Sequence, residues 1–333
     1  MAALMVGSSG MTISSGLQHG AGRSTGSVVE LRQHALSLRD RGFTVIPDAG
    51  LSSSLVARAR ADCIDEVGRL RGMIEGLGLD AVDDRYAFSE IDKRHRLRWS
   101  IQATRNSAWT ACVDEALPRA SEVIERLHTL PAHPDDEGLP LFGELLPKTP
   151  RLDHVGAIVS GHGAKAQAFH ADAGELHLRL SRLSTRHRLF NMFVPLVDLE
   201  AGGMGTMFWP RSHHMRSRRA AYQAAVARAG SLEADPIAMS EMESPACPSG
   251  GIILFDFRVL HRGLPNQSEA ERPIAHAILS TGLAVDQKRT PPTSLVETVA
   301  SLPTDPNERE EARKAIIKEQ RQTWQWLRAS SAQ

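Results

Sequence analysis

Apolar and polar residues follow two different rhythms along the chain, and the change falls near residue 150. Before it, apolar residues recur every three or four positions in several stretches, the period of a helix that buries one face. These stretches are about 28–38, 53–77 and 120–130. A short apolar run, 42–47, ends at a proline and predicts a strand. Residues 131–150 contain five prolines and predict a long loop.

Beyond residue 150 the apolar residues form short runs bounded by Gly, Pro, Asp or Asn. The runs are 155–160, 190–197, 206–209, 252–257 and 274–281. Such spacing predicts a mostly antiparallel β core. Two stretches break the pattern: 217–229 is rich in Ala and Arg and predicts a helical insertion, and a second helix begins near Asp305. Asp305 can cap the N-terminus of this helix, Pro306 takes the first helical position, and Glu308 completes a capping box.

Composition narrows the class of protein. The chain has 39 Lys and Arg residues and 39 Asp and Glu residues, so its formal net charge is zero. This balance gives no reason to expect a general attraction to nucleic acid or to an anionic membrane. The three cysteines lack CxxC spacing, so neither a disulfide framework nor a zinc site is expected. No apolar run reaches the roughly 18 residues of a membrane span. We expect a cytoplasmic protein; residues 1–27, rich in Gly and Ser, predict a disordered tail, with an organellar transit segment as the alternative.

His170, Asp172 and His261 are the candidate metal ligands. An iron site that activates oxygen takes two imidazoles and one carboxylate on one side of the ion and keeps the other side open. Residues i and i+2 share one side of a strand, so His170 and Asp172 can converge. His261 follows the most apolar run, 252–257. The short motif is weak by itself, because His133-Pro134-Asp135 has the same form in the proline-rich loop.

Arg272 is the candidate anchor for an acidic co-substrate. It lies 11 residues after His261, directly before Pro273 and the last apolar run. A turn of that length returns Arg272 to the neighbourhood of His261. Because a guanidinium binds a carboxylate through two parallel hydrogen bonds, Arg272 suits the far carboxylate of a dicarboxylic acid such as 2-oxoglutarate.

Five blocks of sequence, in order, resemble the phytanoyl-CoA dioxygenase family of 2-oxoglutarate oxygenases. They are QAFHAD at 167–172, NMFVPLVDL at 191–199, GTMFWPRSH at 205–213, LFDFRVLHRG at 254–263, and Asn266 with Arg272-Pro273. The resemblance extends from about residue 42 to about residue 281. One departure is Arg211, because the family more often has glycine before Ser-His, and this puts the local turn in doubt.

The resemblance implies a double-stranded β-helix, a jelly-roll barrel with flanking helices. It implies Fe(II) bound by His170, Asp172 and His261, with Arg272 holding 2-oxoglutarate and with Gln167 and Thr206 helping to hold it. The implied reaction consumes O2, releases succinate and CO2, and oxidises, most simply hydroxylates, a C–H bond. Related halogenases have a small residue at the carboxylate position, so Asp172 argues for an oxidative outcome other than halogenation.

The expected organisation has four parts. These are a tail at 1–27, a helical region at 28–150 packing on the barrel, the catalytic barrel at 151–285 with its insertion near 217–229, and an extension with a helix at 286–333. The substrate is expected to be a small molecule whose identity and whose oxidative product the sequence leaves open, as it does the oligomeric state.

Several alternatives stay open. The chain could be a non-catalytic sensor of 2-oxoglutarate or metal, or a cupin-type metalloenzyme that does not use 2-oxoglutarate. His213 and His214 are expected to be structural, in a turn. Residues 179–188 carry four arginines, including Arg182 and Arg186, and either attract an anionic substrate or form a solvated loop.

Overall fold

A computed structural model describes residues 27–103, 107–135, 149–173, 178, 187–284 and 291–329, with only the backbone at 215–217 and 328–329. Its centre is a seven-stranded antiparallel sheet, counted over these residues, in the order β1-β7-β5-β9-β4-β3-β2. The strands are β1 (Phe43–Ile46), β2 (Ile91–His95), β3 (Arg98–Gln102), β4 (Arg151–Ser160), β5 (Leu189–Pro195), β7 (Ile252–Asp256) and β9 (Arg272–Ser280).

A smaller sheet faces the large one. It consists of β6 (Thr206–Phe208) and β8 (His261–Gly263), and single bridges extend it on both sides, His170 to His261 and Phe208 to Glu243. Phe208 of the small sheet packs in one buried cluster with Phe193, Phe255 and Ile274 of the large sheet. The predicted mostly antiparallel core with flanking helices, of jelly-roll type, is therefore confirmed.

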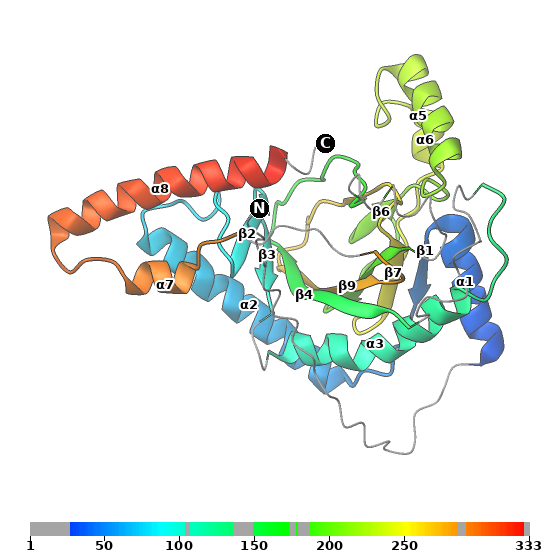
Figure 1. Cartoon of the computed structure of the whole chain (residues 1–333), viewed down its shortest axis with the longest axis horizontal. Helices are drawn as coiled ribbons and strands as arrows, with labels where there is room; N and C mark the ends of the chain where they lie inside the picture. Colours follow the sequence, from blue (N-terminus) through cyan, green and yellow to red (C-terminus); the bar gives the residue numbers. More distant parts are fainter. Residues whose placement is uncertain are drawn as a thin grey trace, which may run out of the picture.

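Helices cover the opposite face of the large sheet. They are α1 (Val28–Arg41), α2 (Ser53–Gly76) and α3 (Ala108–Leu127), and Figure 1 shows α2 and α3 running along the outside of the barrel. Alternation along β9 explains how one strand serves both faces: Ala275 and Ala277 join the cluster with the helices, while Ile274 and Ile278 face the barrel interior.

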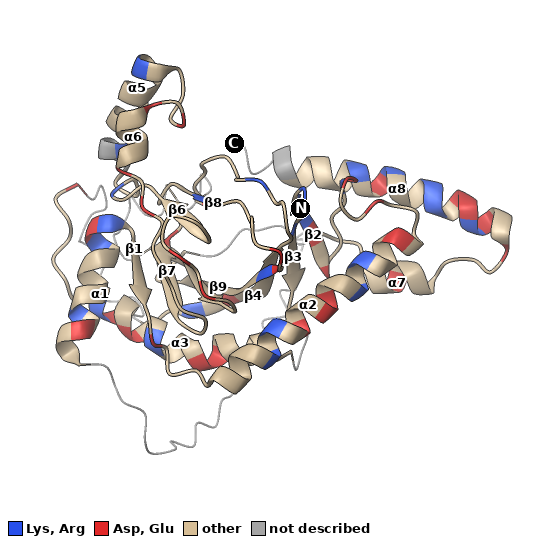
Figure 2. Ribbon diagram, turned by 180° about the vertical axis from the view of Figure 1, so that it is seen from behind, with Lys and Arg blue, Asp and Glu red and all other residues tan. Residues whose placement is uncertain are grey.

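The remaining helices lie at the periphery. They are α5 (Met215–Ala229), α6 (Pro236–Ser240), α7 (Leu295–Ala300) and α8 (Pro306–Ala329). The pair α5 and α6 projects from the barrel near β6, and α8 runs with α7 on the far side (Figure 1). Basic and acidic residues are interspersed along α2 and α8 (Figure 2), in keeping with solvated outer faces. Among the described helices, none has the length and apolar character needed to cross a membrane.

The structure extends one expected helix and adds a hairpin that the pattern did not predict. The helix expected at 120–130 is α3 and begins at Ala108; Pro118, which by itself predicts a helix end, lies inside it. The hairpin of β2 and β3 was not predicted. Its sequence, IDKRHRLRWSIQ, is too charged to look like a strand, yet Asp92, Arg98 and Ser100 are buried on one face of the hairpin.

Candidate metal centre

The three predicted ligands meet at one end of the barrel. One donor atom from each of His170, Asp172 and His261 lies within 4.8 Å of the other two, and within the described part of the chain this is the one such group. His261 opens β8, and the backbone N–H of His170 and that of His261 each donate to the other's carbonyl oxygen at 2.9 Å. This bridge holds the two imidazoles side by side, although their role as iron ligands stays a prediction.

Hydrogen bonds orient all three side chains. The Nδ1 of His170 bonds to the carbonyl of Ala168 at 3.0 Å, and the Nδ1 of His261 bonds to that of Val259 at 3.1 Å. Both Nε2 atoms are thereby directed at Asp172, at 3.9 and 3.5 Å from its carboxylate oxygens. Asn191 of β5 donates to Oδ2 of Asp172 at 2.7 Å. Such partners fix the tautomer and the direction of metal ligands.

Exposure and charge suit a metal with an open side. The side chain of His261 is buried, whereas those of His170 and Asp172 are 39% and 34% exposed. Burial lowers the pKa of His261 to about 4, although Asp172 opposes the shift. Desolvation would raise the pKa of Asp172, but His261, His170 and Arg94 lower it below its usual value. At neutral pH His261 is thus neutral and Asp172 ionised, the forms that bind a metal.

This donor set fits Fe(II). Two imidazole nitrogens and one carboxylate on one side of an ion are the ligands of non-haem iron oxygenases. The partly exposed His170 and Asp172 leave the opposite side accessible from outside the barrel.

Arg272 points into the barrel from the start of β9, on the same face as Ile274. Arg272 is 2% exposed, and its guanidinium donates to the carbonyls of Pro265 and Leu264 at 3.0 and 2.8 Å. Its Nε is buried and makes no hydrogen bond to the described residues. Burial lowers the pKa of Arg272 to about 10, so the group stays charged at neutral pH.

Arg98 of β3 is a second buried arginine beside it, and no motif in the sequence singles it out. Its Nε donates to Ser160 Oγ at 2.9 Å and its Nη2 to Leu264 O at 2.9 Å, while Nη1 makes no hydrogen bond to any residue that the structure describes. Burial and the charge of Arg272 lower the pKa of Arg98 to about 10. The described side chains provide no carboxylate for either guanidinium, and two buried charges of one sign are stable only with an anion nearby.

Gln167 and Thr206 flank the same place. The Oε1 of Gln167 accepts a hydrogen bond from the backbone N–H of Gly263 at 3.0 Å, and Thr206 pairs with Gly263 across β6 and β8. A Cβ at Gly263 would lie 2.5 Å from Gln167 Oε1 and 2.7 Å from Arg98 Nη1. Gln167, Thr206 and Arg98 therefore surround one point of β8, and their role toward a co-substrate stays a prediction.

Comparison with known families agrees with this arrangement. The model of the phytanoyl-CoA dioxygenase (PhyH) family matches residues 39–274, more than two thirds of the chain. The chain belongs to the phytanoyl-CoA dioxygenase family. The protein is thus an oxidoreductase of the 2-oxoglutarate-dependent, non-haem iron class, whose cofactor is Fe(II) and whose co-substrates are 2-oxoglutarate and O2.

Solved structures show more distant similarity. AviO1 from Streptomyces viridochromogenes Tue57 is 15% identical, with 78% of this chain and 99% of that chain covered and a TM-score of 0.48. SnoN, a non-haem α-ketoglutarate-dependent epimerase from nogalamycin biosynthesis, is 14% identical, with coverages of 75% and 82% and a TM-score of 0.46. EvdO2 from Micromonospora carbonacea var. aurantiaca, complexed with 2-oxoglutarate, is 14% identical, with coverages of 78% and 94% and a TM-score of 0.41. The family membership rests on the match over 39–274 alone.

The turn at 210–214 explains the one departure from the PhyH pattern. Arg211 has φ of 70°, the left-handed conformation that favours glycine, so the turn keeps the shape that a glycine would adopt. The turn is anchored on α1, where Arg211 N–H donates to Arg41 O at 2.9 Å and His213 Nε2 bonds to Arg39 O at 2.8 Å. His213 therefore has a structural contact, as expected.

The second His-x-Asp motif also meets a histidine of this turn. The ring of His133 stacks on that of His214 with centroids 4.1 Å apart, and Nδ1 of His133 accepts from the N–H of Asp135 at 3.2 Å. Stacked rings present their faces to each other and their nitrogen lone pairs sideways, so His133 and His214 do not chelate one ion in this arrangement.

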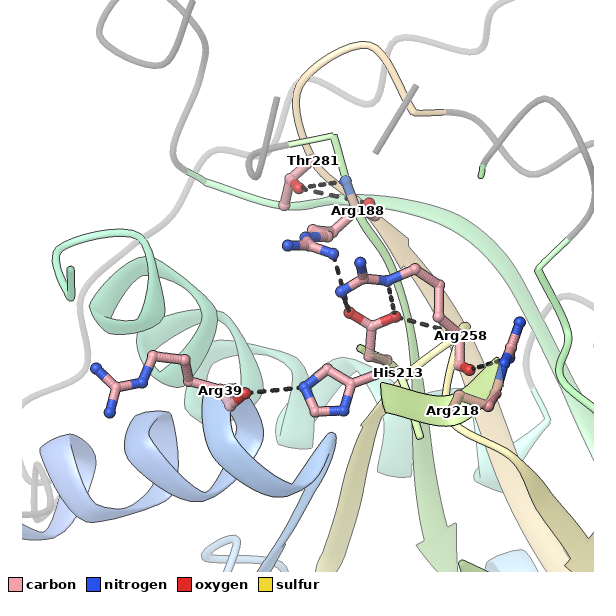
Figure 3. A network of polar contacts seen from close by, with 7 residues as sticks. Arg39, Arg188, His213, Arg218, Arg258 and Thr281 are labelled. Atoms are coloured by element: carbon pink, nitrogen blue, oxygen red, sulfur yellow. Dashed lines mark hydrogen bonds and ion pairs between the residues drawn. The ribbon is translucent and has the colours of Figure 1, made fainter. Parts of the chain in front are cut away.

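Of the basic segment 179–188, only His187 and Arg188 lie within the described residues, and Arg182 and Arg186 lie outside them. Arg188 is 5% exposed, and its Nη1 lies 3.8 Å from Oδ2 of Asp256. Asp256 also accepts from Nε and Nη2 of Arg258 at 2.9 and 2.8 Å (Figure 3). Arg188 thus belongs to a buried ion network, and attraction of an anionic substrate by the other arginines stays a prediction.

Proposed function

We propose that this chain is an Fe(II)- and 2-oxoglutarate-dependent dioxygenase that hydroxylates a C–H bond of a small organic substrate and releases succinate and CO2. The iron ligands are His170, Asp172 and His261. The proposal is carried by one observation: three metal-binding groups with an accessible side converge in the same barrel as two buried arginines that have unused donors.

The ligand side chains are held before any metal arrives. The carbonyls of Ala168 and Val259 engage both Nδ1 atoms, so each imidazole offers Nε2, and Asn191 orients the carboxylate of Asp172. When bound, iron and 2-oxoglutarate together supply the oxidising chemistry, and the protein supplies geometry and shielding.

Arg272 and Arg98 bind the far carboxylate of 2-oxoglutarate in this proposal. Both already hold their guanidinium planes by donating to backbone carbonyls, chiefly that of Leu264. The remaining Nη1 of Arg98 and Nε of Arg272 make no hydrogen bond to the described residues, and in this proposal they donate to the anion. A carboxylate there would also compensate two buried positive charges, which favours a dicarboxylic acid over a neutral ligand.

Aromatic side chains exclude water from the inner side of His261. Phe255 meets its imidazole edge-on with centroids 4.9 Å apart, Phe208 lies at 6.0 Å, and Phe193 packs on Phe255 at 4.9 Å. This wall confines solvent to the open side of the triad, where a substrate would enter.

Loss of a ligand tests the proposal. We expect Asp172→Ala and His261→Ala to lose iron binding and to release succinate from 2-oxoglutarate at least about a hundredfold more slowly, because two ligands hold the ion too weakly. Iron content and succinate release are measured together. His162→Ala is the matched control, because His162 is an exposed histidine bonded to Ser268 O at 2.8 Å.

The same assays separate the alternatives. A sensor would bind 2-oxoglutarate with iron but release no succinate from it under O2. A cupin-type enzyme would bind iron without 2-oxoglutarate, and Arg272→Gln would then leave it unaffected. Undiminished succinate release by Asp172→Ala would remove the ligand assignment.

A further inference from the structure

The inner face of β3 carries a buried hydroxyl that neither the metal centre nor the proposed function uses. Trp99 and Ile101 of this strand pack in the cluster with the helices. Because successive side chains of a strand point to opposite faces, Arg98 and Ser100 face the barrel interior. The strand pairing agrees, since Ser100 lies opposite Ile158 of β4, which packs against the apolar cluster of the interior.

The hydroxyl of Ser100 makes no hydrogen bond within the described part of the chain. The residue is 0% exposed, and its Oγ is buried. Two other buried serines of the sheet are bonded: Ser160 accepts from Nε of Arg98 at 2.9 Å, and Ser280 accepts from Nη2 of Arg151 at 3.0 Å. A buried hydroxyl without a partner costs stability, so native folds keep few of them. The hydroxyl of Ser100 therefore indicates a bound group at this position.

Two donor atoms of the neighbouring arginines are buried in the same way. Nη1 of Arg98 and Nε of Arg272 make no hydrogen bond to the described residues. The two arginines lie at one end of the sheet, because Ser160 of β4 pairs with Arg98 on one side and with Arg272 on the other. Ser100 is the next inward-facing residue after Arg98, about 7 Å along the strand. Three buried donors thus lie around one corner of the barrel interior.

We propose that the hydroxyl of Ser100 donates a hydrogen bond to the far carboxylate of 2-oxoglutarate, together with Arg98 and Arg272. This inference rests on the proposed function and adds a third residue to its co-substrate site. A carboxylate has about four lone-pair positions, so it can accept from all three donors. Its negative charge strengthens each bond, and the two neighbouring guanidinium groups favour an anion in this corner over a neutral ligand.

Ser100→Ala tests the inference, because it removes the hydroxyl and nearly keeps the volume of the side chain. The full chain with Fe(II), kept anaerobic, is titrated calorimetrically with 2-oxoglutarate. We expect the Kd of the variant to be about tenfold higher, the effect of losing one hydrogen bond to a charged group. The urea midpoint of the ligand-free chain should stay the same or rise, because alanine removes an unsatisfied buried hydroxyl. A serine with a purely structural role would give a lower midpoint and an unchanged Kd.

A matched serine and a matched acid serve as controls. Ser280→Ala loses the bond to Arg151 at the other end of β9, so its urea midpoint should fall while its 2-oxoglutarate Kd changes less than about twofold. The acid is 2-oxopentanoate, which has the keto acid and the chain length of 2-oxoglutarate without its far carboxylate. Ser100→Ala should change the affinity for this acid less than about twofold, because the contact that it removes is to the far carboxylate.

Two results would overturn the inference alone: an unchanged 2-oxoglutarate Kd in Ser100→Ala, or an equal loss of affinity for 2-oxoglutarate and 2-oxopentanoate. The second result would mean that the hydroxyl does not act on the far carboxylate. Failure of the proposed function looks different, because the unaltered chain would then not bind 2-oxoglutarate with iron. The inference would fail with it, since both concern the same ligand.

Discussion

Gly263 shows how a single absent side chain shapes the proposed co-substrate site. A Cβ there would approach Gln167 Oε1 and Arg98 Nη1 to 2.5 and 2.7 Å, too close for either to stay in place. Both atoms are the ends of long side chains, so they can move away at small cost to the fold. An added Cβ would therefore displace the guanidinium of Arg98 and leave the barrel fold unchanged.

Gly263→Ala is therefore expected to weaken 2-oxoglutarate binding about tenfold, the effect of losing one hydrogen bond to a charged group, while stability changes by less than about 1 kcal/mol. Calorimetry with Fe(II) present and urea unfolding measure the two effects. Gly203→Ala, where no atom lies within 4 Å of the added Cβ, is the control. Equal 2-oxoglutarate affinities in the two variants would contradict the placement of Arg98.

At the scale of elements, the junction of α1 and β1 joins a helix to the sheet through one residue. Gly42 ends α1 with φ of 87° and donates its N–H to Leu38 O at 3.1 Å. Its Cα also faces the turn at 210–214, since a Cβ would lie 2.6 Å from Nδ1 of His213. A helix end, a strand start and the turn beside β6 thus meet where only glycine fits.

Gly42→Ala should lower the free energy of unfolding by about 2 kcal/mol or more, because left-handed strain adds to the clash with His213. Urea unfolding measures it. Gly50→Ala is the comparison, because Gly50 has φ of 77° but no atom within 4 Å of the added Cβ, so it reports the strain alone. A loss no larger than that of Gly50→Ala would mean that His213 moves aside freely.

At the scale of the whole molecule, α8 connects the end of the chain to the hairpin that carries Arg98 and Ser100. Oε1 of the fully buried Gln320 accepts from Ala87 N–H at 3.2 Å, and Trp324 donates to Lys93 O at 2.9 Å. The match to the PhyH family ends at residue 274, so α8 lies beyond the matched region. Its contacts support β2 from outside while the site lies inside.

Gln320→Ala should lower the free energy of unfolding by about 2 kcal/mol, because it leaves the N–H of Ala87 unsatisfied and opens a cavity. Urea unfolding followed by circular dichroism gives the value. The matched control is Gln322→Ala, an exposed glutamine of the same helix, with a loss under about 0.5 kcal/mol. Equal losses would show that α8 contributes nothing to the support of β2.

The sequence by itself determined the elements whose apolar residues follow a clear period and the antiparallel core, and it singled out the three candidate metal ligands, which converge in the structure, together with Arg272. Apolar rhythm suffices for the elements, because strand alternation is a property of nearby residues. The candidate ligands, which lie as far apart as His170 and His261, follow from ordered sequence blocks that resemble the family. Only the tertiary structure revealed Arg98 and Ser100. Buried charged residues of their hairpin, Asp92 and Arg98 among them, alternate with apolar ones, and such a strand looks like a solvated loop until the neighbouring β4 and β9 are in place.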